Sequence, residues 1–152
     1  MVLFQEEQKF NQWWLWAILL GSGAATLIGM WPLLVGGELW PPVLILGIYL
    51  AILIGFATVS LRTTIHPDRL SVGFPPFGAK VIRKEDISRA YVRTYSPLGE
   101  YGGWGYRMGR KGKAYNVSGD QGLQLELRNG ERILIGTREP ERLRMTIERW
   151  VN

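Results

Sequence analysis

Two long runs without a charged side chain constrain the fold of this chain more than any other feature. Residues Asn11–Gly37 and Leu39–Leu61 contain no Asp, Glu, Lys or Arg, and Glu38 alone lies between them. A helix needs about 20 predominantly apolar residues to cross the hydrocarbon core of a bilayer. The two runs therefore predict two membrane-spanning helices, at about 14–34 and about 43–61.

The basic residues are distributed very unevenly along the 152 residues of the chain. Of the 18 Lys and Arg residues, all except Lys9 lie at or after Arg62, and the formal net charge is +5. This distribution predicts a short N-terminal segment (1–12), a two-helix membrane hairpin (13–61) and a basic soluble domain (62–152). The soluble domain is long enough for one small hydrophobic core.

The ends of the predicted spans carry residues that favour the membrane–water interface. Amphipathic indole rings prefer the level of the headgroups. Five tryptophans lie at these ends, with Trp13, Trp14 and Trp16 at the start of the first span and Trp31 and Trp40 on either side of the turn. The turn between the spans has no Lys or Arg, whereas basic residues follow the second span closely, so the positive-inside rule places both termini in the cytoplasm. A cleaved signal peptide is the alternative for the first span, but its flank is not basic and its apolar run is too long.

Small residues recur at every fourth position of each predicted span. These two ribbons are Gly21, Ala25 and Gly29 in the first span and Gly47, Ala51 and Gly55 in the second. A ribbon of small residues lets two helix backbones approach closely in lipid. We expect the ribbons to pack against each other within the hairpin, and the alternative reserves one ribbon for a partner protein. Neither span carries an ionisable residue of the kind that marks an ion or proton path.

Catalytic and metal chemistry find little support in the sequence. The absence of Cys excludes disulfides, thiol nucleophiles and Cys-based metal sites. His66 is the only imidazole, it precedes a proline, and no second histidine supports it as a ligand. Ser118 and Asp120 lack the base that a nucleophilic site requires. We therefore expect no enzyme activity, no cofactor, no metal and no small-molecule substrate.

Short alternating segments separated by turn residues predict a mainly-β structure after Arg62. The expected strands are 63–65, 70–74, 79–83, 89–95, 104–108 and 114–117, followed by a hairpin over 123–135. A two-residue turn at Asn129–Gly130 would send the Leu and Ile residues of this hairpin to opposite faces. A three-residue loop, Arg128–Gly130 with a left-handed Gly130, places both sets on one face, and we predict that loop.

An amphipathic helix is expected at the end of the chain, from about Glu139 to Val151. Pro140 suits the first turn of a helix because a proline there forfeits no hydrogen bond. A stripe formed by Leu143, Ile147 and Trp150 would be its buried face.

About seven strands followed by one C-terminal helix is the order found in pleckstrin-homology-like (PH-like) barrels. The segments that carry a closer likeness are Tyr101–Arg107, Ala114–Gly119, Gly122–Leu125 and Ile135–Thr137. In these segments the chain resembles uncharacterised bacterial membrane proteins with a two-helix hairpin and a bacterial PH-like domain. The resemblance implies a membrane α-helical hairpin joined to a PH-like barrel, and a bacterial origin. With the spans and orientation derived above, we expect a multi-pass protein of the bacterial inner membrane. The resemblance implies no reaction.

Aromatic and basic residues gather in the glycine-rich stretch of the soluble domain. Tyr and Trp beside Arg is the composition of protein-interface hot spots, and each cation near an anionic leaflet contributes about 1 kcal/mol. The candidate contacts for a partner protein or an anionic phospholipid are Tyr101, Trp104, Tyr106, Arg107, Arg110, Lys111 and Lys113. Acidic residues are interspersed among the basic ones, so nucleic-acid binding is not expected.

The predicted function is that of a non-catalytic accessory or scaffold subunit of a larger bacterial membrane protein complex, for which a respiratory or photosynthetic assembly is one candidate host. The hairpin would pack laterally against integral membrane protein subunits, and the PH-like domain would clamp their cytoplasmic face. The alternative is the binding or sensing of anionic phospholipid headgroups by the PH-like domain.

Overall fold

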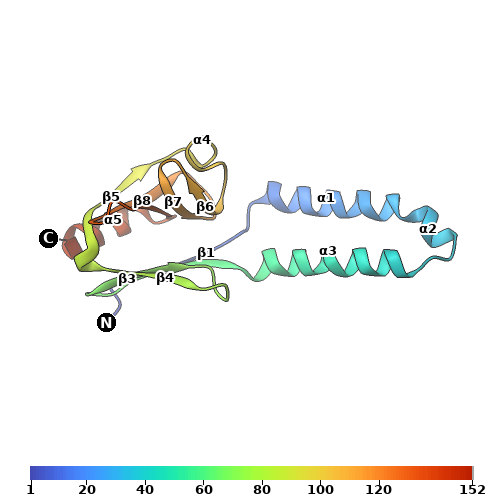
Figure 1. Ribbon diagram of the computed structural model, residues 1–152, viewed down its shortest axis with the longest axis horizontal. Helices are drawn as coiled ribbons and strands as arrows, with labels where there is room; N and C mark the ends of the chain where they lie inside the picture. Colours follow the sequence, from blue (N-terminus) through green and yellow to red (C-terminus); the bar gives the residue numbers. More distant parts are fainter. Residues whose placement is uncertain (152) are drawn as a thin grey trace. The chain divides into compact units, whose positions relative to one another are not determined.

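The computed structural model describes residues 1–151 and divides the chain into two compact units (Figure 1). The helical unit is Phe10–Val59. The sheet unit joins Met1–Lys9 to the chain from Ser60 onward. Because Lys9 and Ser60 are register partners in neighbouring strands, the helical unit is an insertion at the end of one strand pair.

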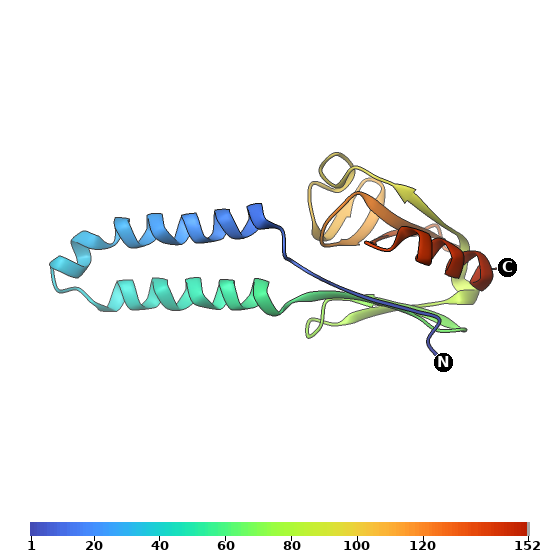
Figure 2. The ribbon, with the colours of Figure 1, turned by 180° about the vertical axis from the view of Figure 1, so that it is seen from behind.

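The helical unit contains α1 (Trp13–Gly29), α2 (Trp31–Val35) and α3 (Trp40–Thr58). Helices α1 and α3 run side by side in opposite directions in both views (Figures 1 and 2). Their surfaces are apolar on nearly every side. Each helix has one buried residue, Gly23 in α1 and Pro42 in α3. Packing within this unit therefore covers little of its apolar surface.

The helix boundaries differ from the predicted spans. The first span was expected to continue to residue 34, but α1 ends at Gly29 and α2 restarts at Trp31, because Pro32 has no N–H to donate to the preceding turn. The second span was expected over 43–61, but α3 runs from Trp40 to Thr58, and Leu61 is a buried strand residue. Within residues 1–151, α3 is the helix whose length and composition suffice to cross a membrane, whereas α1 is shorter, at 17 residues.

The sheet unit is mainly β, as expected, and its nine strands within the described residues form two sheets. The first sheet is antiparallel, in the order β1 (Phe4–Lys9), β2 (Ser60–Ile65), β3 (Arg69–Gly73) and β4 (Ala79–Arg83). The order of the second sheet is β5 (Ile87–Thr94), β8 (Gln121–Leu127), β9 (Arg132–Gly136), β7 (Gly112–Asn116) and β6 (Gly105–Gly109). Strands β7 and β9 are parallel, and the other pairs are antiparallel.

Strand β1 corrects the expectation that residues 1–12 form a separate segment. It pairs with β2 along its whole length and turns Phe4, Glu6 and Gln8 inward. Two of these three buried side chains are polar, so the segment lacks the alternation of apolar and polar residues that identifies a half-buried strand.

The core of the sheet unit lies between the two sheets and α5 (Pro140–Val151). Residues from all three are almost completely buried: Phe4, Leu61, Ile65, Leu70, Val72, Leu123, Leu125, Ile133, Ile135, Leu143, Ile147 and Trp150. Helix α5 packs against β5 and β8, and the Trp150 indole Nε1 donates to the Pro67 carbonyl oxygen at 3.0 Å. The predicted stripe of this helix is therefore its buried face.

The predicted three-residue hairpin loop is confirmed by the register of β8 and β9. Leu123 pairs with Ile135 and Leu125 pairs with Ile133. The backbone of Gly130 has a φ of +87°, and its N–H donates to the Leu127 carbonyl oxygen at 3.0 Å. A left-handed residue at this position closes such a loop, and glycine adopts that conformation without strain.

Candidate functional site

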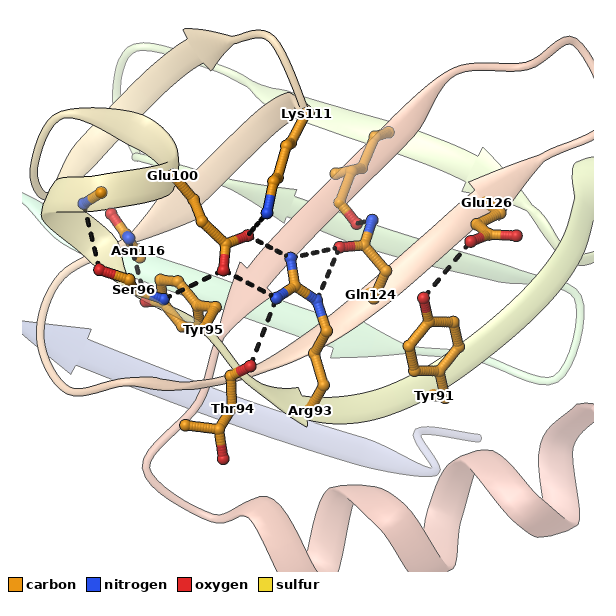
Figure 3. Close-up of polar contacts among 12 residues, drawn as sticks. Tyr91, Arg93, Thr94, Tyr95, Ser96, Glu100, Lys111, Asn116, Gln124 and Glu126 are labelled. Atoms are coloured by element: carbon orange, nitrogen blue, oxygen red, sulfur yellow. Dashed lines mark hydrogen bonds and ion pairs between the residues drawn. The ribbon is translucent and has the colours of Figure 1, made fainter.

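Polar residues from β5, from β8 and from the β6–β7 turn gather around Glu100 in α4 (Pro97–Tyr101) (Figure 3). Ser96 caps this short helix by accepting a hydrogen bond from the Gly99 N–H at 3.1 Å, and Pro97 occupies its first turn. The Arg93 guanidinium, from β5, grips the Glu100 carboxylate with Nη2 to Oε2 at 2.7 Å and Nη1 to Oε1 at 3.1 Å. The helix cap and the ion pair together fix α4 to the second sheet.

Two more side chains complete the cluster around this ion pair. The Gln124 Oε1 accepts hydrogen bonds at 3.1 Å from Nε and Nη2 of Arg93. The Lys111 Nζ lies 3.6 Å from the Glu100 Oε2, and Figure 3 shows Glu100 between the two cations. One carboxylate therefore faces two positive charges, and the cluster is net cationic.

The ionisation of this cluster is fixed by its hydrogen bonds. The bidentate bond from Arg93, opposed by partial burial, lowers the pKa of Glu100 to about 2. The same bond raises the pKa of Arg93. Glu100 thus stays an anion at every physiological pH, and the arrangement serves as a structural clamp rather than as a proton donor.

Buried polar groups position β6 beside the clamp. The Asn116 Nδ2 donates to the Tyr95 hydroxyl oxygen at 3.0 Å, and the Asn116 Oδ1 accepts from the Gly105 N–H at 2.9 Å. Burial raises the pKa of Tyr95 to about 12, so its hydroxyl stays protonated. These bonds fix the first residue of β6 to the end of β7.

A second charge cluster joins the two sheets. The Glu131 Oε1 accepts a hydrogen bond from the Lys80 Nζ at 2.6 Å and another from the Lys113 Nζ at 2.7 Å. The Lys113 and Lys80 bonds lower the pKa of Glu131, and the Glu131 bond raises the pKa of Lys113. Because Lys80 lies on β4 and Lys113 on β7, this carboxylate links a strand of one sheet to a strand of the other.

Several residues of the predicted contact surface are buried or already bonded to other groups of this chain. Tyr101 is buried at 6% exposure and belongs to the core, which corrects its assignment as a surface contact. Lys111 and Lys113 are engaged by carboxylates, as described above. The Arg107 Nε donates to the Trp104 carbonyl oxygen at 3.0 Å, and the Trp104 indole Nε1 donates to the Gly119 carbonyl oxygen at 3.3 Å.

Four of the predicted contact residues are exposed, namely Tyr106, Arg107, Arg110 and Lys111. Tyr106 is half exposed, and Arg110 has no carboxylate partner among residues 1–151. Sequence reasoning missed Arg93, Glu100 and Glu131, because charged residues on separate strands and loops give no periodic signal of their pairing. It also missed Phe77, whose position between Pro76 and Gly78 in a turn is the available signal for its exposure.

The glycine ribbons of the helical unit do not pack against each other, contrary to expectation. A Cβ built at Gly21, Gly29, Gly47 or Gly55 meets nothing within 4 Å. The contact lies instead at Gly23, where a Cβ would overlap the Tyr49 ring, and the Tyr49 hydroxyl donates to the Leu19 carbonyl oxygen.

Helix geometry explains this difference. Gly23 is two residues from Gly21, and Tyr49 is two residues from Gly47. Each residue advances about 100° around a helix, so two residues reach nearly the opposite face. Both ribbons therefore point away from the contact between α1 and α3, and Ala25 and Ala51 are likewise exposed.

The predicted interface tryptophans are accessible to different degrees. Trp13, Trp31 and Trp40 are 81%, 66% and 72% exposed, and Trp14 is 37% exposed. The Trp16 indole Nε1 instead donates to the Phe10 carbonyl oxygen at 2.9 Å, which fixes the start of α1.

His66 and the acidic residues form no metal centre in the described part of the chain. The His66 Nδ1 lies 3.3 Å from the Met1 carbonyl oxygen. Within residues 1–151, no group of three or more His, Cys, Asp or Glu side chains is placed to hold a metal ion. Comparison of the chain with protein-family models, curated proteins and solved structures finds no match.

Proposed function

We propose that this protein is a non-catalytic accessory or scaffold subunit that packs laterally against integral membrane proteins through the outward-facing ribbons of its helical unit. The open space at Gly21, Gly29, Gly47 and Gly55 carries the proposal. Small residues on a lipid-exposed helix face allow another helix to approach closely, and the ribbons are unused within this chain.

The membrane location of the helical unit is supported by its exposed apolar side chains. Ile18, Ile28 and Val43 are 62%, 75% and 68% exposed and belong to a large contiguous apolar surface, of the kind that faces lipid or a partner. Helix α3 has 19 residues and extends about 28 Å, close to the thickness of the hydrocarbon core. The basic residues after it favour both termini in the cytoplasm of a bacterial cell.

A hollow on the helical unit supports a lateral partner. Gly55 lies in an apolar depression of about 330 Å³ that is also lined by Phe10, Ile52, Phe56 and Val59. The Phe10 and Phe56 rings meet edge to face at 5.7 Å, which holds one wall in place. A projecting apolar side chain of a neighbouring helix would fill this depression.

We interpret the sheet unit as a PH-like barrel with two insertions. Strands β1 to β4, then β5, β8 and β9, and finally α5 follow the order of seven strands and a C-terminal helix. In this interpretation the helical unit replaces the connection between β1 and β2, and the β6–β7 hairpin is added at one edge. The unit would clamp the cytoplasmic face of the partner, for which a respiratory or photosynthetic complex is one candidate.

The experiment is gentle detergent extraction of the full chain from native membranes, followed by native-gel sizing and identification of co-migrating proteins. We expect a large assembly with stoichiometric partners, and loss of those partners when Gly29→Leu or Gly47→Leu fills a ribbon. Ala24→Leu is the matched control, because Ala24 is exposed on α1 but lies outside the ribbon. Migration of the wild-type chain alone, or full retention of partners by every ribbon variant, would overturn the proposal.

The alternative of headgroup recognition has less support than the scaffold role. A hollow of about 440 Å³ is lined by Arg110, Lys111, Lys113 and Arg132, but Glu131 lies in it as well. Because Lys111 and Lys113 already pair with carboxylates, this hollow attracts a headgroup less strongly than the count of its cations implies.

A further inference from the structure

Large exposed apolar side chains occur in the turn between β3 and β4 and on the edge strand β6. Phe77 is 81% exposed in the turn between β3 and β4, and Tyr106 and Met108 are 50% and 70% exposed on β6. Tyr106 and Met108 are two residues apart in one strand, so they project from the same face of it. Strand β6 is the last strand of its sheet, and its residues are mostly exposed.

Phe77 and Tyr106, which belong to different sheets, lie on one continuous surface. Phe77 and Tyr106 line the same hollow of about 430 Å³, together with Phe74, Lys80 and Tyr115. The Tyr115 ring connects Phe74, in the same turn as Phe77, to Tyr106, because its centroid lies 6.4 Å from that of Phe74 and 5.0 Å from that of Tyr106. The aromatic rings therefore support one another in a fixed arrangement.

The register of the first sheet places this surface at the end where the chain enters the helical unit. Lys9 pairs with Ser60, and Arg62 pairs with Gly73. If the pairing of β2 with β3 is extended by two residues beyond Arg62 and Gly73, position 75 lies opposite Ser60. Each residue of a strand spans about 3.3 Å. The turn that carries Phe77 thus reaches the level of the first strand residue after the apolar segment.

The charge around the aromatic residues is positive. Arg110 follows β6 directly and has no carboxylate partner within residues 1–151. Lys80 and Lys113 share the single carboxylate of Glu131, which leaves one positive charge in excess. Apolar rings beside a net excess of positive charge match an anionic membrane surface, where rings enter the interface and cations meet phosphates.

We propose that Phe77, Lys80, Tyr106, Met108 and Arg110 form a docking edge that inserts into the headgroup region of the anionic leaflet entered by the helical unit. The inference rests on the membrane insertion of the proposed function but not on its partner protein. Covalent attachment keeps the edge at a high effective concentration near that leaflet, so weak contacts suffice to dock it. Docking would fix the orientation of the sheet unit on the membrane.

The absence of cysteine allows a direct test with single spin labels on the full chain. Labels would be introduced by Phe77→Cys and by Met108→Cys in nanodiscs of phosphatidylcholine and phosphatidylglycerol at a ratio of 3:1. Met145→Cys is the control, since Met145 is 55% exposed and shares a hollow with Pro67, in the turn at the opposite end of β2 and β3. Ile54→Cys, on the exposed face of α3, reports membrane insertion itself.

We expect the ratio of oxygen to nickel-chelate collisions to be high at positions 54, 77 and 108 and low at position 145. Replacing phosphatidylglycerol with phosphatidylcholine should reduce the ratio of docked to undocked protein. Arg110→Gln removes one cation and should reduce the same ratio by about fivefold. Lipid contact at 54 with water contact at 77 and 108 would overturn the docking edge and leave the membrane anchor intact. Water contact at position 54 would refute the membrane anchor. Shielding of position 77 in native membranes but not in nanodiscs would indicate contact with a protein and would also overturn the docking edge.

Discussion

The ion pair between Arg93 and Glu100 should stabilise the sheet unit measurably, and Glu100→Gln removes it without a large change in shape. Glutamine keeps one acceptor oxygen but loses the negative charge that Arg93 and Lys111 face. The variant also leaves the Arg93 guanidinium, which is 25% exposed, without an anion. We therefore expect α4 to separate from the second sheet more often.

The magnitude follows from the pKa of Glu100. A fall from the ordinary value of 4.5 to about 2 corresponds to roughly 3 kcal/mol of preference for the ionised form in the folded protein. The Glu100 side chain is 14% exposed and Lys111 is 59% exposed, so solvent screens part of this interaction. We expect the measured loss of unfolding free energy to be about 1–2 kcal/mol.

The assay is hydrogen exchange of the full chain in detergent micelles, resolved by segment with mass spectrometry. A loss of about 1–2 kcal/mol should accelerate exchange of the amides in β5 and α4 by about 5–30-fold at pH 7. The folded-state pKa is depressed, so the stabilisation is complete above pH 4.5 and is lost as the pH falls towards about 2. The difference between wild type and Glu100→Gln should therefore shrink across that range, after correction for intrinsic exchange rates.

The control is Glu85→Gln, which breaks a pair between Arg83 and Glu85 whose side chains are 74% and 73% exposed. Such exposed pairs contribute little, so exchange should be unchanged. Equal exchange of wild type and Glu100→Gln at pH 7 would refute the clamp. A difference that persists at pH 2 would show that the effect of the substitution is not electrostatic.

Three further predictions concern the sheet unit. Replacing residues 10–59 with an Asn-Gly turn should yield a folded water-soluble monomer. The fragment 62–152 lacks β1 and should fail to fold, and circular dichroism with size-exclusion chromatography distinguishes the two outcomes. Gly112→Ala, which combines a φ of +110° with a Cβ that collides with the β9 backbone, should unfold the protein at lower denaturant concentration than Gly119→Ala, whose Cβ meets open space. Leu143→Ala should cost about 2–5 kcal/mol in urea unfolding, because Leu143 is fully buried.

The sequence by itself determined the features that depend on neighbouring residues. The charge-free runs predict a separate apolar unit, and the structure has one at Phe10–Val59. The odd-numbered Leu and Ile residues select the three-residue loop at Gly130, because a strand alternates its faces every residue. The stripe of α5 likewise follows from the helical period.

Only the tertiary structure decided the features that depend on residues far apart in the chain. Strand β1 is stabilised by pairing with β2, which follows it in the sequence only after the whole helical unit. Its inward Glu6 accepts hydrogen bonds from Thr137 and Arg138, more than 100 residues away in the sequence. The direction of the glycine ribbons depends on which helix faces meet, and the contact at Gly23 decides it. Local periodicity reports which side of an element is apolar, but which partner covers that side depends on packing among distant segments, and no local pattern encodes it.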